Sequence, residues 1–349
     1  MPNTVTISKN IHELLADKKP FVCYRKAGEE RGVKLTQEND NLYFAQDFKT
    51  GGFVMAAFDT RKNPILIPLD KSSKSYFDIP KISLNLKSTQ VNFHTEDRET
   101  HIALVTQAVV FIKANKATKI VISRTKEQPI DKAKIGELFE NLLYAYSNAM
   151  VYIWYHPKVG LWMGATPEKL VSLDYSQYKT MALAGTQVYT ENCQWGAKEQ
   201  EEQQLVTDYV RTQLASISKK ITIGASYTVK AGHLAHICTD ITGELAPNHT
   251  ILDLLAQLHP TPAVCGTPRE IAKDFIMQNE GYDRGFYTGF LGELDLNNSS
   301  DLFVNLRCMQ LIDDKAILYI GGGITAASNP VKEWEETQNK AAVMGRILG

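Results

Sequence analysis

Two pairs of glutamates, each spaced three residues apart, are the residues of this chain that most directly suggest chemistry. Glu199 and Glu202 form one pair, and Glu333 and Glu336 form the other. In a helix such residues lie on one face, so each pair can direct two carboxylates to one point. Two facing pairs could hold Mg²⁺, which prefers oxygen ligands, and leave positions for substrate and water. The alternative is that each pair is a solvated helix surface, or a charged first turn favoured by the helix dipole.

A run of three glycines precedes the second glutamate pair. Residues 321–323 are all glycine and follow the apolar residues 316–320, which are typical of a strand. Without side chains they let a ligand approach the backbone closely, and their N–H groups can bind an anion. Lys340 lies four residues after Glu336 and shares its helical face. Glycine N–H groups and a lysine suit a carboxylate substrate, and the run matches neither GxGxxG nor the Walker pattern.

The elements that must position these residues are a mixture of strands and helices without the regular βαβ alternation of a Rossmann sheet. Apolar periodicity and capping signals predict helices over residues 11–15, 95–115, 132–148, 198–214 and 330–344. Short β-rich runs bounded by turn residues predict strands over residues 21–24, 42–44, 53–58, 65–67, 119–124, 151–155, 161–164, 169–173, 180–183 and 301–311. Ser8 or Asn10 is expected to cap the first helix.

Two polar side chains stand in apolar surroundings. Arg307 interrupts the alternating run 301–311, and an arginine in a mostly buried strand requires an anion or a buried carboxylate. His236 lies in the apolar run 234–239. A lone histidine in such a run is more often a hydrogen-bonded core residue than a catalyst, and the run alone leaves its role open.

Composition excludes several classes of protein. The chain has 349 residues, and 38 Lys and Arg against 39 Asp and Glu give a net charge of −1. This balance provides no broad basic field for nucleic acid or an anionic membrane. We see no apolar run that could span a bilayer, and no signal-peptide core in residues 1–10. The five cysteines are scattered without a CxxC pair, which is typical of reduced cysteines, so we expect a cytoplasmic protein.

Six motifs follow one another along the chain in an order that is specific to one family. They are Gly164-Ala165-Thr166-Pro167-Glu168, Leu183-Ala184-Gly185-Thr186, residues 258–266, Asp283-Arg284-Gly285, Gly321-Gly322-Gly323-Ile324 and residues 333–340. Together they resemble the chorismate-utilising enzymes, which include isochorismate synthase, salicylate synthase, anthranilate synthase component I and aminodeoxychorismate synthase component I. The resemblance implies an α+β fold in which two large antiparallel sheets form a sandwich with helices outside. It also implies a single domain over 1–349, with variable N-terminal strands over 1–95 and a motif-bearing core over 96–349.

Within this family the chain most resembles isochorismate synthase, and the resemblance implies a role for two residues. Lys119 matches the general base for the water that attacks C2 of chorismate, and Glu168 matches the general acid for the departing C4 hydroxyl. Water is a poor nucleophile and hydroxide a poor leaving group, so both are needed, on opposite faces of the ring. Burial is expected to lower the pKa of Lys119 and to raise that of Glu168.

The resemblance also implies a metal and a substrate cradle. Mg²⁺ would lie on the ring carboxylate of chorismate, held by Glu202 and Glu336, with Glu199 and Glu333 acting directly or through water. The residues implied to contact chorismate are Thr186, His236, Ala263, Tyr287, Arg307, Gly321, Gly323 and Lys340. Among these, Arg307 with Tyr287 would bind the pyruvyl carboxylate, a task suited to a forked donor.

Positions that differ among family members narrow the reaction. Amine-adding members carry an uncharged residue, often glutamine, at the position of Lys119, and aminodeoxychorismate synthases often carry a nucleophilic lysine at the position of Ala184. Both positions favour water as the nucleophile and predict that no glutamine amidotransferase subunit is needed. Gln203 departs from the family, in which histidine is frequent there.

Several alternatives remain open at this stage. A salicylate synthase would form isochorismate and then eliminate pyruvate, with the same acid and base. An anthranilate or aminodeoxychorismate synthase component I, or a catalytically silent chorismate-binding protein, would use the same cavity. The product could feed menaquinone or a catecholate siderophore. We expect a monomer or weak homodimer that has chorismate as its small-molecule substrate and no nucleic-acid or membrane partner.

Overall fold

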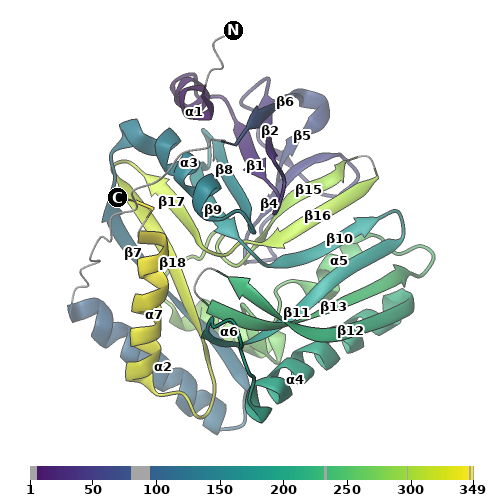
Figure 1. The fold of residues 1–349 in the computed structure, drawn as a ribbon, viewed down its shortest axis with the longest axis vertical. Coiled ribbons are helices and arrows are strands. Elements are labelled where there is room, and N and C mark those ends of the chain that lie inside the picture. Colours follow the sequence, from purple (N-terminus) through teal and green to yellow (C-terminus); the bar gives the residue numbers. More distant parts are fainter. Residues whose placement is uncertain (1–5, 80–94, 232–233, 297, 346, 349) are drawn as a thin grey trace.

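The computed structural model describes residues 6–79, 95–231, 234–296, 298–345 and 347–348. Over these ranges the helices are α1 (Ile7–Ala16), α2 (Thr95–Lys113), α3 (Ile135–Ala145), α4 (Ala197–Leu214), α5 (Ile251–Leu258), α6 (Arg269–Asn279) and α7 (Pro330–Gly345). Figure 1 shows α7 lying beside α2, and both contact the sheet at strand β18 (Lys315–Ile324). Helix α4 lies on the other half of the molecule, against β11 (Gln177–Val188).

The strands of the described residues form two nine-stranded sheets with antiparallel pairing. The first sheet contains, in spatial order, β14 (Gly266–Thr267), β7 (Lys119–Pro129), β18, β17 (Cys308–Ile312), β9 (Gly160–Thr166), β8 (Met150–His156), β1 (Phe21–Arg25), β2 (Arg31–Gln37) and β6 (Ser72–Asp78). The second contains β12 (Ser218–Ala231), β13 (Leu234–Leu245), β11, β10 (Lys169–Asp174), β16 (Ser299–Val304), β15 (Phe290–Leu296), β4 (Gly52–Ala56), β5 (Ile65–Pro68) and β3 (Tyr43–Phe44).

Strands that are buried at every position pack the two sheets together. In β1, Phe21 packs under α1 and α3, whereas Val22 packs between the sheets. In β4, Phe53 joins the same central core and Val54 packs under α4 and α5. Successive side chains of a strand point to opposite faces, so continuous apolar runs bury both faces of each sheet. The result is the predicted α+β sandwich, with helices on its outer faces.

The N-terminal strands are shared between the two sheets. Strands β1, β2 and β6 belong to the first sheet, and β3, β4 and β5 belong to the second. The predicted strands over 21–24, 53–58 and 65–67 are present as β1, β4 and β5. The predicted cap of the first helix is wrong, because α1 starts earlier and the side chain of Thr6 accepts a hydrogen bond from the Lys9 N–H at 3.4 Å.

The predicted strand over 301–311 is also wrong. Its first part is β16 of the second sheet and its last part is β17 of the first sheet. Arg307 lies in the connection, with φ +48°, a left-handed conformation that is uncommon for a residue other than glycine. Because most residues of both strands are buried, apolar residues continue on both sides of the crossing and hide it. The crossing places Arg307 at the junction of the two sheets.

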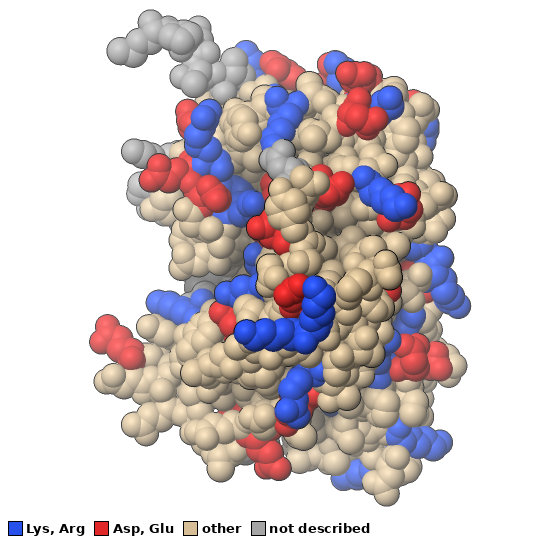
Figure 2. Space-filling model, turned by 90° about the vertical axis from the view of Figure 1, so that its right-hand side faces the viewer, with Lys and Arg blue, Asp and Glu red and all other residues tan. Residues whose placement is uncertain are grey.

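Charges of opposite sign lie close together on the surface. On the face shown in Figure 2, Lys and Arg side chains are interspersed with Asp and Glu side chains. Ion pairs among the described residues include Lys169 with Asp301 at 2.5 Å and Lys179 with Asp240 at 2.7 Å. Among the described helices, none is long and apolar enough to cross a membrane.

Candidate active site

Segments of both sheets and helices α4 and α7 enclose a cavity of about 470 Å³. The predicted site residues that line it are Lys119, Glu168, Glu199, Glu202, His236, Ala263, Tyr287, Arg307, Gly321, Gly323, Glu333, Glu336 and Lys340. Thr186 is the remaining predicted substrate contact, and its side chain lies outside the described residues. Motifs that are spread from β7 to α7 along the chain therefore meet at one site.

Glu168 is held at the corner between β9 and β10. The N–H of Val304 donates to its carbonyl oxygen at 3.0 Å, and Thr166 Oγ1 donates to the carbonyl oxygen of Val304 at 2.5 Å. The Glu168 side chain is buried, with 6% of the residue exposed. Burial disfavours the ionised carboxylate and raises its pKa to about 7, although the charges of Lys119 and Arg307 act in the opposite direction. Near neutral pH this carboxyl group can therefore donate a proton.

Lys119 is the first residue of β7, and its side chain crosses the glycine strand, that is, the part of β18 formed by residues 321–323. Its side chain is 21% exposed, and its Nζ lies 3.5 Å from Oε1 of Glu202. A Cβ atom at Gly323 would come within 2.9 Å of Lys119 Cε. A larger residue at position 323 would therefore displace the lysine. Glycine at this position is explained by the side chain that crosses it.

The glycine run continues β18 and does not form a loop. Gly322 is opposite Ile122 of β7, whereas the neighbouring Val121 donates its N–H at 2.8 Å to the segment before β14. Backbone groups of a strand alternate between its two edges. The N–H groups of Gly321 and Gly323 therefore point away from β7, on the side where the pairing with β17 has ended. Of the three predicted anion-binding N–H groups, that of Gly322 is therefore engaged in the sheet, and the other two remain available to a ligand.

Lys340 and Tyr287 reach the same glycine strand. Lys340 Nζ donates to the carbonyl oxygen of Gly321 at 3.0 Å and lies 2.7 Å from Oε1 of Glu336. The Tyr287 hydroxyl lies over Gly321, where a Cβ atom would come within 2.6 Å of it. The Tyr287 ring stacks on Tyr319, with centroids 5.3 Å apart. Donors from a strand, a helix and a turn thus gather at one part of the cavity and can bind a carboxylate.

The two glutamate pairs line the cavity from α4 and α7. Glu202 is paired with Lys119 and Glu336 with Lys340, and Ser328 Oγ donates to Glu333 at 2.7 Å. In the part of the chain that the structure describes, no three His, Cys, Asp or Glu side chains are close enough to hold a metal ion. Mg²⁺ is usually held by one or two carboxylates, with water and substrate oxygens as its other ligands. The donor set therefore fits a magnesium ion that binds together with an anionic substrate.

His236 and Gln203 are held by hydrogen bonds to the backbone of β11. His236 Nδ1 donates to the carbonyl oxygen of Gly185 at 3.0 Å, and burial lowers the pKa of the ring, which is therefore neutral at pH 7. The histidine is thus both hydrogen-bonded and part of the cavity wall. Gln203 Nε2 donates to the carbonyl oxygen of Ala182 at 2.9 Å and to Thr239 Oγ1 at 3.0 Å. The glutamine that departs from the family pattern thereby fixes α4 on the sheet next to Glu202.

Sequence reasoning missed two lining residues that stand between β18 and α7. Thr325 and Ser328 both line the cavity. Ser328 Oγ accepts a hydrogen bond from the Thr325 N–H at 3.1 Å and donates to Glu333. Asn329, which follows this serine and directly precedes the helix, is the capping residue, since its Oδ1 accepts hydrogen bonds from the N–H groups two and three residues later at 3.0 and 3.1 Å. This signal could have indicated that Ser328 lies beside the first turn of α7.

The fold and the site define a chorismate-utilising enzyme. Residues 71–349 match the family described as chorismate binding enzyme, and the chain belongs to this family. The solved structure of DhbC from Bacillus anthracis superposes with a TM-score of 0.77 and 26% sequence identity, covering 97% of this chain and 99% of that one. The sandwich of two antiparallel sheets is therefore the fold of the family, as the motifs predict.

Two curated relatives indicate where in the family the chain stands. It is 33% identical over 264 residues to the salicylate biosynthesis isochorismate synthase of Pseudomonas aeruginosa, covering 72% of this chain and 55% of that protein. It is 32% identical over 268 residues to isochorismate synthase DhbC of Bacillus subtilis, covering 70% of this chain and 66% of that protein. The aligned part thus spans a little over half of the first relative and about two thirds of the second.

Proposed function

We propose that this protein converts chorismate to isochorismate by adding water at C2 and releasing the C4 hydroxyl. The observation that carries the proposal is that Lys119 and Glu168 line one cavity, together with donors suited to carboxylates. Similarity to two relatives named isochorismate synthase supports the same reaction. Lys119 also argues against an amine-adding reaction, because the resemblance associates that reaction with an uncharged residue at this position.

Chorismate has two carboxylates, and the cavity offers separate donors for each. Arg307 at the junction of the sheets would bind the pyruvyl carboxylate through its forked guanidinium, with Tyr287 as the second donor that the resemblance implies. The free N–H groups of Gly321 and Gly323, with Lys340, would bind the ring carboxylate. Binding both ends of the substrate fixes the ring between the base and the acid.

The residues of the chain then move two protons. Lys119, as the general base, would take a proton from the water that forms the new C2–O bond. Glu168, as a neutral carboxyl, would give a proton to the C4 hydroxyl, which leaves as water when the C4–O bond breaks. The two conjugated ring double bonds shift with these steps, from C1=C2 and C5=C6 to C1=C6 and C4=C5, so the product is an isomer of the substrate. Exchange of one proton between each group and solvent restores the starting state.

Mg²⁺ is the cofactor that we propose for this site. Glu202 and Glu336 would hold it, and Glu199 and Glu333 would act directly or through water. When bound, the ion would supply positive charge at the ring carboxylate and help to orient the substrate. The lysines that neutralise Glu202 and Glu336 in the structure would then be free to face the substrate.

The proposed reaction is tested by incubating the purified protein with chorismate and separating the products by chromatography. With Mg²⁺ present we expect isochorismate as the product. With EDTA we expect the rate to fall on the order of 100-fold and to return when Mg²⁺ is added, because the charge of the ring carboxylate is then uncompensated. Salicylate with pyruvate would assign the salicylate synthase reaction, and unchanged chorismate would contradict both.

The raised pKa of Glu168 predicts the alkaline side of the pH profile. A general acid is competent only when protonated, so the competent fraction decreases as pH rises through about 7. Above that value we expect kcat/KM of the wild type to fall about tenfold per pH unit relative to that of Glu168→Gln, because kcat/KM reports the free enzyme and the comparison cancels the titration of every other group. The measurement is kcat/KM from pH 6 to 9, roughly the range over which a group of this pKa titrates. The same alkaline decrease in Glu168→Gln would assign it to another group.

A further inference from the structure

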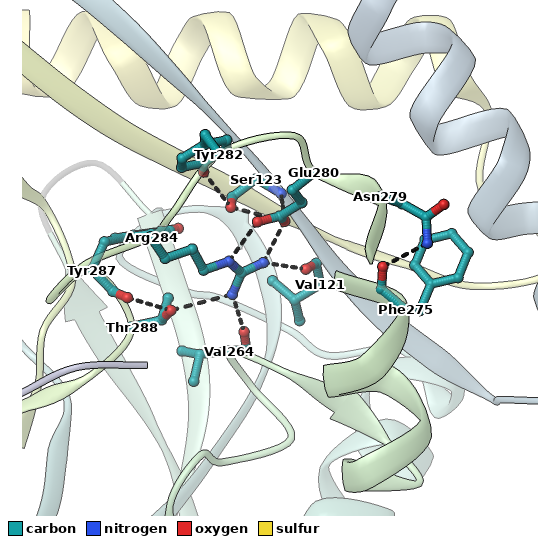
Figure 3. Close-up of polar contacts among 10 residues, drawn as sticks. All are labelled: Val121, Ser123, Val264, Phe275, Asn279, Glu280, Tyr282, Arg284, Tyr287 and Thr288. Carbon is teal, nitrogen blue, oxygen red and sulfur yellow. Dashed lines mark hydrogen bonds and ion pairs between the residues drawn. The ribbon is translucent and has the colours of Figure 1, made fainter. Parts of the chain in front are cut away.

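A buried ion pair lies behind the cavity wall. Arg284 and Glu280 are four residues apart, just after α6, and their side chains are 2% and 1% exposed. Arg284 Nε donates to Oε2 of Glu280 at 2.7 Å, and Nη2 donates to Oε1 at 2.5 Å (Figure 3). This is the two-bond geometry that makes guanidinium–carboxylate pairs strong and directional. Neither residue is part of the cavity lining.

The other N–H groups of Arg284 reach three segments of the cavity wall. Nη2 donates to the carbonyl oxygen of Val121 at 2.7 Å. Nη1 donates to the carbonyl oxygen of Val264 at 3.0 Å and to Thr288 Oγ1 at 3.2 Å. All three contacted residues line the cavity. One guanidinium therefore joins β7, the loop before β14 and the turn before β15, as Figure 3 shows.

Each contacted residue is next to, or two positions from, a residue of the proposed site. Val121 is two residues after Lys119 on the same strand, so both point their side chains to the same face of β7. The other two contacts directly follow Ala263 and Tyr287 in the chain. A shift of the guanidinium would thus move the base, the pocket loop and the pyruvyl-binding turn together.

Glu280 holds β7 from the same side. Its Oε1 accepts hydrogen bonds from the N–H of Ser123 at 2.7 Å and from Ser123 Oγ at 2.9 Å. Ser123 Oγ also contacts the Tyr282 hydroxyl at 2.7 Å. The strand is therefore fixed on both sides of Ile122, the residue that is opposite Gly322 in β18. The pair sets the position of β7 against the glycine strand.

Stability alone does not explain a buried pair of this kind. Removing two charges from water is costly, and apolar residues at such positions are often equally stabilising. What apolar residues cannot do is bind three separate backbone segments in one geometry. Thr288, one of the contacted residues, has φ +59°, which is strained for a β-branched residue and must be maintained by its surroundings.

We propose that Glu280 and Arg284 are a positioning pair for the chorismate reaction. They hold the strand that bears Lys119, the loop of Ala263 and the turn of Tyr287 in the arrangement that turnover requires, and they do so without contacting the substrate. The inference rests on the proposed function, because it assigns these two residues to the same site.

The test compares Arg284→Met with the double variant Glu280→Gln/Arg284→Met. The single variant leaves a buried carboxylate uncompensated and should lower Tm. The double variant removes both charges, so its Tm should return toward that of the wild type. If the pair positions the site, kcat of the double variant stays at least about tenfold below that of the wild type, and chorismate KM changes by a smaller factor. The reason is that a small misplacement of the reacting groups greatly slows the reaction. A double variant with recovered Tm and wild-type kcat would overturn the inference.

Two further variants keep the result unambiguous. Arg284→Lys retains the charge and folding but cannot reach all the acceptors, so its kcat should fall at least about fivefold; unchanged kcat would overturn the inference.

Glu293→Gln is the matched control, since Glu293 accepts hydrogen bonds from Tyr24 and Lys26 at 2.7 Å, away from the cavity. Its kcat should stay within about threefold, and an equal loss there would show that removing any ion-paired glutamate has this effect. Wild-type protein that makes no isochorismate refutes the proposed function, whereas active wild type with fully active pair variants refutes only this inference.

Discussion

Replacing Glu168 by glutamine is expected to lower kcat for chorismate by about 10³-fold, with chorismate Kd changed by less than about threefold. Glutamine has nearly the same shape and can keep the position at the corner of β9 and β10, but it cannot give up a proton to the departing hydroxyl. The structure buries this carboxyl group and raises its pKa to about 7, which is the state that a general acid needs. Steady-state kinetics and calorimetric titration with chorismate measure the two effects separately.

A second buried glutamate provides the control for this substitution. Glu140 on α3 also has a pKa raised by burial, and it accepts a hydrogen bond from the Ser8 N–H at 3.1 Å, outside the cavity. Glu140→Gln should therefore keep kcat within about twofold to threefold even if Tm changes. If Glu168→Gln loses chorismate binding as well as turnover, the residue supports the structure of the site and is not its acid.

Replacing Lys119 by alanine is expected to lower kcat by about 10²-fold to 10⁴-fold, the usual contribution of a general base. Water at C2 would then have no group to take its proton, although Glu168 could still protonate the leaving hydroxyl. Removing the ammonium also frees Glu202, which lies 3.5 Å from it, so Mg²⁺ binding should be kept or strengthened. Product formation under saturating chorismate, with a magnesium titration of the same variant, checks both expectations.

The control for the lysine substitution is Lys26→Ala. Lys26 is paired with Glu293 at 2.7 Å and does not line the cavity. Its removal should leave turnover nearly unchanged, since only a partly exposed ion pair is lost. A Lys119→Ala protein that converts chorismate at the wild-type rate would refute the assignment of the base.

Local sequence patterns predicted many elements of this fold but not their partners. The helix over 198–214 is present as α4, because its length and composition fix it locally. The pairing of β7 with β18 joins segments that are far apart in the chain, and local periodicity of apolar residues does not reveal which strands pair. The run 301–311 shows the limit most clearly, since one run that reads as a single strand belongs to two different sheets. The sandwich was predictable only because ordered motifs resemble those of a known family.

The site was predictable as a set of residues but not as a set of interactions. Spacing placed Glu199 with Glu202 and Glu333 with Glu336, and it could not tell a solvated face from a cavity wall. Tertiary packing decides that question by placing α4 and α7 at the same cavity. Glu280 and Arg284 are four residues apart, but spacing gave no sign of the other acceptors of Arg284, because they come from three distant segments.

The central claim is that Lys119 activates a water molecule that becomes the new hydroxyl, while Glu168 expels the old one. Converting chorismate in H₂¹⁸O and analysing the isochorismate by mass spectrometry at early conversion tests this most directly. The mechanism predicts one ¹⁸O atom per product molecule, located at C2. Isochorismate without ¹⁸O would mean that the hydroxyl moves within the substrate, and would contradict the roles given to both residues.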